Sequence, residues 1–205
     1  MEKYFKEIVE GKMYKTLQHC FDESKCNDSK IVGSVVDLCK NYETEDFNSW
    51  FLHYLSLHGK DLDESTKRLM DDTRMDKDSC YNCIVAFLVY KTWLGVQMER
   101  LAKELLYGTK WEVKDANADA DKKYGVDLII VRNNKPLYGI QVKPISYLKK
   151  TQQEELPKEV LWNKEKNKKY KEKFGYDVLY IYYNEKKKFD IKEIELIKDK
   201  IRELM

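Results

Sequence analysis

Hydrophobic positions in the first 78 residues recur at helical spacing. One stripe has a period of four residues, at Phe5, Val9, Met13 and Leu17. A second apolar stripe covers residues 28–42 and a third covers residues 48–59, and we expect the third to stop at Gly59. Residues 60–78 are charged and mixed, and they predict a loop or a short helix. This part of the chain therefore predicts a helical region, residues 1–78.

Residues 79–108 form the longest regular segment of the sequence. Its apolar residues are dense at first and become amphipathic after Gly95. Asp78 or Ser79 is suited to cap its beginning, and Gly108 is suited to the left-handed position that ends many helices. The pattern predicts one long helix, buried in its first half and packed on a sheet by one face in its second.

From Trp111 the hydrophobic period changes to two. Residues 111–113 predict a short strand and residues 114–125 a polar loop. The runs 126–131 and 137–143 predict two strands, and the sequence RNNKP between them is typical of a turn. We expect these two strands to pair as an antiparallel hairpin.

The last third of the chain alternates helix and strand. A lysine- and glutamate-rich helix is predicted over 149–173, a strongly β-prone strand over 176–183, and an amphipathic helix over 189–204. The order of elements predicts an α/β (α+β) fold in which helices flank a central mixed sheet. We assign this core to residues 79–205 and the separate helical region to residues 1–78.

The composition is that of a globular chain with an uneven charge. Apolar residues make up 42% and charged residues 36% of the 205 residues, with a net charge of +2. Residues 1–95 contain 13 basic and 17 acidic side chains, and the remainder contains 25 and 19. The basic second half fits a polyanionic partner, although a solvated lysine-rich surface explains it as well.

Cysteine usage and hydropathy indicate a cytoplasmic protein. No apolar stretch approaches the length of about 20 residues that spans a membrane, and the first residues do not resemble a secretory signal. Five cysteines, an odd number, favour reduced thiols. Cys80 and Cys83 have zinc-like spacing, but no second pair accompanies them, so we expect them in a helix core.

Three polar residues mark the ends of the predicted hairpin. Side chains two residues apart in a strand project to the same face, so Gln141 and Lys143 lie about 7 Å apart. A turn near residues 133–135 places Asp127 opposite both of them. Gly139 shares this face and is expected to leave room there for a backbone or a ligand.

Such a set suits metal-assisted cleavage of phosphodiesters. The carboxylate of Asp127, the side-chain carbonyl of Gln141 and the main chain at Val142 offer the oxygen ligands that Mg²⁺ prefers. The metal activates water and polarises the phosphate. Lys143 can orient that water or stabilise negative charge on phosphorus. The alternative interpretation is an amphipathic hairpin with a polar end.

The spacing of GVD (125–127) and QVK (141–143) resembles the core of PD-(D/E)xK restriction endonucleases. Asp127 matches the first acid and Lys143 the motif lysine. Gln141 stands where Asp or Glu is usual, as in the Gln-x-Lys variant of Mrr-type and some type II enzymes, and Val126 replaces the proline. The preceding helix also resembles the family, and Glu99, or less well Glu104, matches a glutamate that often faces the metal site.

This resemblance implies a Mg²⁺-dependent type II restriction endonuclease that cleaves double-stranded DNA. One active site per chain implies a homodimer, with the helical region supplying recognition, dimer contacts or both. Residues after the motif lysine and on the following helix are candidate phosphate contacts: Ser146, Tyr147, Lys149, Lys150, Lys164 and Lys168. Lys171 follows at the same helical spacing, and a solvated Glu–Lys face explains the helix equally well.

Two alternatives stay open at this stage. The first is a structure-selective repair nuclease or Holliday junction resolvase, which the extra helical region disfavours. The second is a catalytically inactive DNA-binding module of the same fold. Gln141 favours the second alternative, because a neutral amide binds a metal ion more weakly than a carboxylate does.

Overall fold

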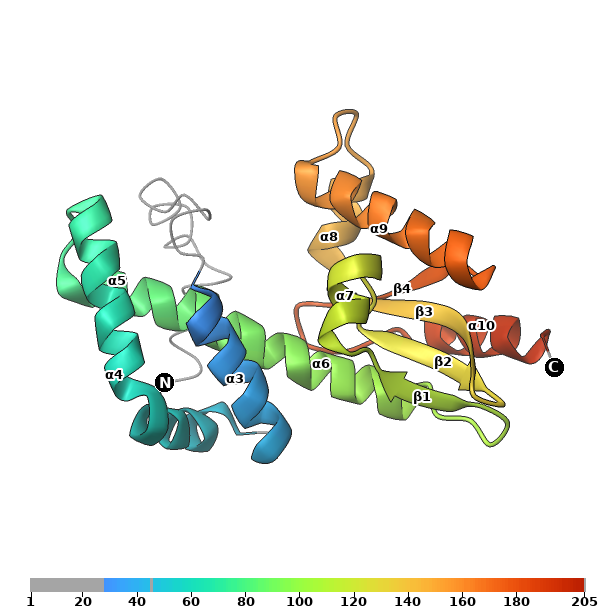
Figure 1. Ribbon diagram of the computed structural model, residues 1–205, viewed down its shortest axis with the longest axis horizontal. Coiled ribbons are helices and arrows are strands. Elements are labelled where there is room, and N and C mark those ends of the chain that lie inside the picture. The colour runs from blue at the N-terminus through green and yellow to red at the C-terminus, as the bar shows by residue number, and fades with distance from the viewer. Residues whose placement is uncertain (1–27, 45, 205) are drawn as a thin grey trace. The chain divides into compact units, whose positions relative to one another are not determined.

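The chain forms two compact units, Met1–Gln97 and Met98–Met205, in a computed structural model (Figure 1). The structure describes residues 28–44 and 46–204. The predicted stripe from Phe5 to Leu17 lies outside the described residues.

The described part of the first unit is helical. Its elements are α3 (Ser29–Asn41), α4 (Phe47–Thr73), α5 (Lys77–Ile84), the π-helical turn η1 (Val85–Tyr90) and the beginning of α6 (Lys91–Leu105). Three aspartates, at positions 28, 46 and 76, cap α3, α4 and α5 by accepting backbone N–H groups of the first turn. The cap of the long helix is therefore Asp76, two residues before the predicted Asp78.

The predicted helix end at Gly59 is wrong, because α4 continues to Thr73. A glycine inside a helix costs about 1 kcal/mol relative to alanine. The apolar side chains beyond it continue the buried face: Leu62 and Leu69 are 0% and 4% exposed. Burial of this second stripe offsets the cost of the glycine, and residues 60–73 are helix rather than loop.

Aromatic and aliphatic side chains of four helices build the core of this unit. Phe47 meets the ring of Tyr90 edge-on, with centroids 5.0 Å apart, and Trp50 stacks on Tyr54 at 5.2 Å. Cys80 and Cys83 are fully buried in the same cluster. Both thiols therefore lie in a helix core, as their sequence context predicts.

The second unit is built on a four-stranded mixed sheet with the order β1-β2-β3-β4 (Figure 1). The strands are β1 (Glu112–Asp115), β2 (Leu128–Arg132), β3 (Lys135–Pro144) and β4 (Val178–Tyr183). Antiparallel pairing joins β1 to β2 and β2 to β3, and parallel pairing joins β3 to β4. This arrangement confirms the predicted mixed sheet.

The hairpin between β2 and β3 has the turn and the antiparallel pairing that its sequence predicts. Asn133 and Asn134 both have positive φ, 49° and 60°, which is the backbone of the tightest hairpin turns. Leu128 pairs with Ile140 and Ile129 with Gly139. That register places Asp127, one residue before β2, opposite Gln141.

The space beside Gly139 is filled by protein, contrary to the expectation of room for a ligand. A Cβ atom at this position would lie 2.6 Å from Val126 Cγ1 and 3.3 Å from Tyr170 Cε2. Gly139 thus allows helix and strand side chains to pack closely on the middle of the sheet.

The helices of the second unit correct three sequence predictions. The predicted loop 114–125 contains α7 (Ala118–Tyr124), capped by Asn117 and ended by Gly125 at φ 62°. The predicted helix 149–173 is divided into α8 (Ile145–Thr151) and α9 (Lys158–Phe174), because Pro157 cannot continue a preceding helix. Gly108 is not left-handed; its bare backbone lies against the Trp111 ring, which a Cβ would approach to 2.3 Å.

Two further contacts complete the second unit. The hydroxyl of Tyr170 on α9 donates to the carbonyl of Leu137 in β3 at 2.8 Å. The terminal helix α10 (Ile191–Arg202) is amphipathic and buries Ile194, Ile197 and Ile201, whereas Leu204, expected on the same face, lies beyond the helix and is 38% exposed. No helix among residues 28–44 and 46–204 has both the length and the apolar character needed to cross a bilayer.

Candidate active site

Asp127 is held between the two central strands. Its backbone N–H donates to the carbonyl of Ile140 at 2.8 Å, and its Oδ2 accepts the N–H of Val142 at 2.7 Å. The side chain is 11% exposed. The head of β2 therefore presents a carboxylate to the end of β3, where the predicted partners lie.

Gln141 and Lys143 complete this end of the hairpin. Gln141 is 2% exposed, and no described residue donates a hydrogen bond to its Oε1 atom. Lys143 Nζ lies 4.0 Å from Asp127 Oδ2, the outer limit of an ion pair. The lysine is near the carboxylate, yet this distance leaves its ammonium group able to contact another anion.

Glu99 on α6 supplies a second carboxylate to the same cluster. Burial, and next the charge of Asp127, raise the pKa of Glu99 to about 8, while Lys143 acts in the opposite direction. Because the charges of Asp127 and Lys143 both shift the pKa of Glu99, its carboxyl group lies near these two residues. The other glutamate considered from the sequence, Glu104, is exposed on the same helix.

The cluster has more buried acid than its cations compensate. Burial raises the pKa of Asp127, whereas Lys143 and the N–H of Val142 hold it down. Asp121 on α7 adds further negative charge, which raises the pKa of both Asp127 and Glu99. A buried charge that lacks compensation is costly, so this cluster is a place where an added cation is stabilised.

The donor set fits a hard divalent cation. Asp127 and Glu99 offer carboxylate oxygens, and Gln141 offers a buried carbonyl oxygen without a hydrogen-bond partner among the described residues. Mg²⁺ prefers such oxygen ligands and keeps several waters. Among the described residues no three His, Cys, Asp or Glu side chains form a metal-binding group. At this site the third oxygen donor would be the amide of Gln141.

The predicted phosphate contacts lie on α8 and α9, and their surroundings differ. Ser146, Lys149 and Lys164 are exposed. Lys150 and Lys168 are exposed too, and each pairs with a glutamate, at 2.9 Å and 3.8 Å. Tyr147 is 3% exposed, and its hydroxyl accepts Asn163 Nδ2 at 2.8 Å, so its ring is part of the packing between α8 and α9.

Lys166 is the neighbour of this cluster that the sequence analysis missed. Its side chain covers Gly125, where a Cβ would lie 3.2 Å from Lys166 Cδ, and its charge lowers the pKa of Asp127. Five lysines occur between residues 158 and 169. The sequence gives no sign of which of them faces inward, except that position 166 is one turn before the buried Tyr170.

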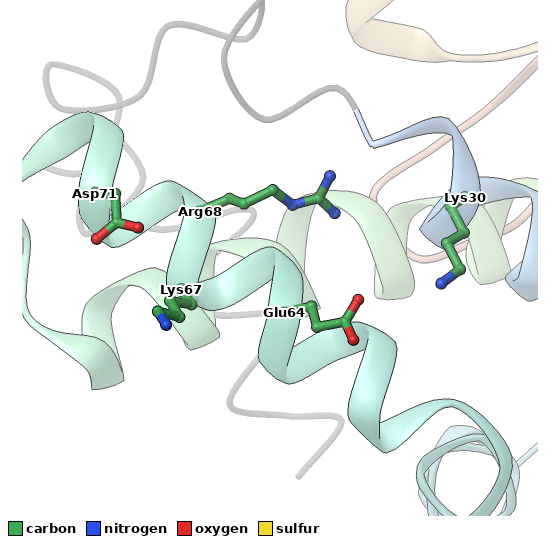
Figure 2. A pocket seen from close by; sticks show the side chains of 5 residues that line it. All are labelled: Lys30, Glu64, Lys67, Arg68 and Asp71. Carbon is green, nitrogen blue, oxygen red and sulfur yellow. The ribbon is translucent and has the colours of Figure 1, made fainter.

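A separate charged hollow of about 470 Å³ lies in the first unit (Figure 2). Its lining comes from α3 and α4: Lys30, Glu64, Lys67, Arg68 and Asp71. Lys30 pairs with Asp61 and Arg68 with Asp28, both at 2.6 Å. Two of the three cations that line the hollow, Lys30 and Arg68, are thus already paired, and none of the candidate catalytic residues lines it.

The mixed sheet, its flanking helices and the GVD…QVK hairpin define a nuclease of the restriction endonuclease-like class. The chain belongs to the MjaI restriction endonuclease family, whose model matches residues 15–196. Comparison with curated proteins gives no match, and comparison with solved structures gives none either.

Proposed function

We propose that this protein is a Mg²⁺-dependent type II restriction endonuclease that cuts double-stranded DNA at a specific sequence. Membership of a restriction endonuclease family supports the endonuclease activity. The observation that carries the metal-dependent part is the convergence of Asp127, Gln141 and Lys143 at one end of the hairpin.

Asp127, Gln141 and Glu99 are the proposed metal-holding side chains, with the main chain at Val142 beside them. When bound, Mg²⁺ would polarise the phosphate and lower the pKa of an attacking water. The backbone N–H of Val142 fixes one oxygen of Asp127 at 2.7 Å and so orients the carboxylate. Gln141 contributes a carbonyl oxygen that burial keeps away from bulk water.

Lys143 is the proposed catalytic lysine. Its ammonium group is within 4.0 Å of Asp127 without being closely bound to it. From this position it can orient the attacking water and stabilise the negative charge that develops on phosphorus. The exposed residues Ser146, Lys149 and Lys164, together with Lys150 and Lys168, are proposed to contact neighbouring phosphates.

A homodimer follows from the number of sites. The described residues of one chain offer one such cluster, and cutting both strands at a palindromic sequence requires two, related by a two-fold axis. We assign recognition, dimer contacts or both to the helical region before the catalytic core. Its charged hollow offers polar side chains for either task.

The test is a digest of unmethylated phage DNA with Mg²⁺, with a chelator in the control reaction. We expect discrete fragments that require the metal. A smear would instead indicate a nuclease without sequence specificity. Cleavage confined to branched DNA would indicate a structure-selective resolvase or repair enzyme.

A catalytically inactive DNA-binding module is the second candidate, and Gln141 is the observation that favours it. An amide is a weaker metal ligand than the carboxylate usual at this position. DNA binding without cleavage of linear or branched DNA, in Mg²⁺ and in Mn²⁺, would support this candidate and contradict the first.

A further inference from the structure

Trp162 on α9 is the exposed member of the four tryptophans of the chain. It is 68% exposed, whereas Trp50, Trp93 and Trp111 are between 0% and 8% exposed. Its neighbour Leu161 is also exposed, at 46%. A large aromatic ring in water is unfavourable, and such residues often mark a binding surface.

Lys166 follows Trp162 by four residues, so both side chains lie on one face of α9. The stem of Lys166 packs over Gly125, two residues before Asp127. Within the described parts of the chain, no carboxylate lies within ion-pair distance of its ammonium group. The lysine thus lies beside the candidate active site, and its ammonium group forms no ion pair with the carboxylates of residues 28–44 and 46–204.

Helix α7 lies beside this face of α9 further along its length (Figure 1). Tyr124 of α7 meets the ring of Tyr170 edge-on at 5.8 Å, and Lys173 lies 5.6 Å above the Tyr124 ring. The C-terminal half of the face is therefore covered by protein. Trp162, at the other end, is not.

The positive charge of α8 and α9 indicates which kind of partner would bind at Trp162. Exposed lysines are frequent on α8 and on α9, the helix that carries Trp162: Lys149, Lys150, Lys158, Lys164, Lys168 and Lys169. Only two of these, Lys150 and Lys168, have ion-pair partners among the described residues. A basic surface with an exposed aromatic ring is complementary to a nucleic acid, whose phosphates attract lysine and whose sugars and bases pack on rings.

We propose that Trp162 and Lys166 form a DNA-contacting edge next to the candidate active site, with Lys166 paired to a backbone phosphate and Trp162 packed against the adjacent nucleotide. This inference rests on the proposed function and extends it, because it names residues outside the Gln-x-Lys motif that position the DNA strand. Lys166 and Trp162 act by positioning the DNA, and the chemistry stays with Lys143.

Tryptophan fluorescence tests the role of Trp162. The full chain carrying Lys143→Ala is mixed with linear phage DNA and Mg²⁺, so that DNA binds without being cut, and acrylamide quenching is measured. Because the other three tryptophans are buried, the quenchable emission comes from Trp162. We expect DNA to reduce the quenching, and we expect Trp162→Phe to remove both the quenchable emission and the effect of DNA.

Binding measurements test the role of Lys166. Lys166→Ala should weaken DNA binding and lower the slope of log affinity against log salt by about 1, the value of one phosphate contact. Trp162→Ala should weaken binding about tenfold with an unchanged slope. The controls are Lys188→Ala, at an exposed position after β4, and Tyr107→Ala, at another exposed aromatic residue.

Three results would overturn the inference. In the first, the wild type cleaves DNA, but DNA does not change the quenching of Trp162 and both variants bind DNA as the wild type does. The proposed function would then hold without this inference. Another is protection of Trp162 by raised protein concentration without DNA, which would make it a contact between copies. The third is a wild-type protein that does not bind DNA, which would remove the proposed function as well.

Discussion

At the scale of single residues, the site combines features that the sequence predicts with others that only the structure reveals. The predicted convergence of Asp127, Gln141 and Lys143 is confirmed as geometry, because strand alternation and the Asn-Asn turn determine the register. The inward position of Lys166 could not be predicted, since lysine-rich helices look alike on every face. The catalytic roles of these residues stay predictions.

Gln141→Glu tests whether the amide faces a metal ion. The substitution adds a third buried carboxylate to Asp127 and Glu99, so we expect the metal-free protein to lose at least about 1 kcal/mol of unfolding free energy. Mg²⁺ should bind more tightly and restore the stability. Thermal melts with and without Mg²⁺, together with calorimetric titration, measure both effects. Gln152→Glu, at an exposed position, is the control.

Unchanged Mg²⁺ affinity in Gln141→Glu would contradict this account of the site. The amide oxygen would then be a buried polar atom of the sheet without a role in metal binding.

The stability of the metal-free protein should fall as the pH rises, because of Glu99. The pKa of Glu99 is raised to about 8 by burial and by Asp127, whereas in the unfolded chain it is about 4.3. Between these values the folded state binds the extra proton, so each rise in pH destabilises it, by up to about 1.4 kcal/mol per pH unit. Below pH 4.3 both states are protonated and the effect vanishes.

Thermal melts between pH 5 and pH 8, taken without divalent ions, measure this dependence. Glu99→Gln should flatten the curve, and Glu104→Gln, exposed on the same helix, should leave it unchanged. Equal slopes for the wild type and Glu99→Gln would show that the carboxyl group is not the cause.

At the scale of elements, strands were predicted well and helix boundaries less well. Period-two alternation and β-branched residues determine β2, β3 and β4, and the antiparallel hairpin follows from the turn residues. Two glycines misled the prediction, because Gly59 lies inside α4 and Gly108 packs under Trp111. Whether a helix continues past a glycine depends on the burial of the apolar side chains that follow it. The glycine itself does not contain that information.

The two glycines Gly139 and Gly59 should respond oppositely to alanine. At Gly139 a Cβ would lie 2.6 Å from Val126 Cγ1, so Gly139→Ala should cost about 1–3 kcal/mol of unfolding free energy. At Gly59 the Cβ would meet nothing within 4 Å, and Gly59→Ala should stabilise α4 by up to about 1 kcal/mol. Denaturant unfolding of both variants checks the pair. A stable Gly139→Ala protein would contradict the close packing of α9 on the sheet.

At the scale of the whole molecule, the sequence predicts a helical region followed by a nuclease core, and family membership extends across both units. Their division of labour remains a proposal. Patterns of charge and hydrophobicity describe each surface, but they do not say which side chains read bases or which surface meets a second copy. Contacts of that kind depend on a partner that the sequence does not contain.

A dimer should assemble on one duplex. Because the part of one chain that the structure describes offers one candidate site, we expect two chains per short duplex in sedimentation analysis. We also expect a plasmid to be cut in both strands without lasting accumulation of the nicked circle. A complex of one chain with one duplex that still makes double-strand breaks would contradict the dimer.

The most direct test of the central claim is a digest of phage DNA in which Lys143→Ala is compared with the wild type. The claim is that the hairpin end of Asp127, Gln141 and Lys143 performs the cleavage. We expect discrete fragments from the wild type and from the control Lys188→Ala, an exposed lysine after β4. Lys143→Ala should cleave at least about a hundredfold more slowly, while its circular dichroism spectrum stays that of the folded wild type. A folded Lys143→Ala protein that cuts as fast as the wild type would contradict the account.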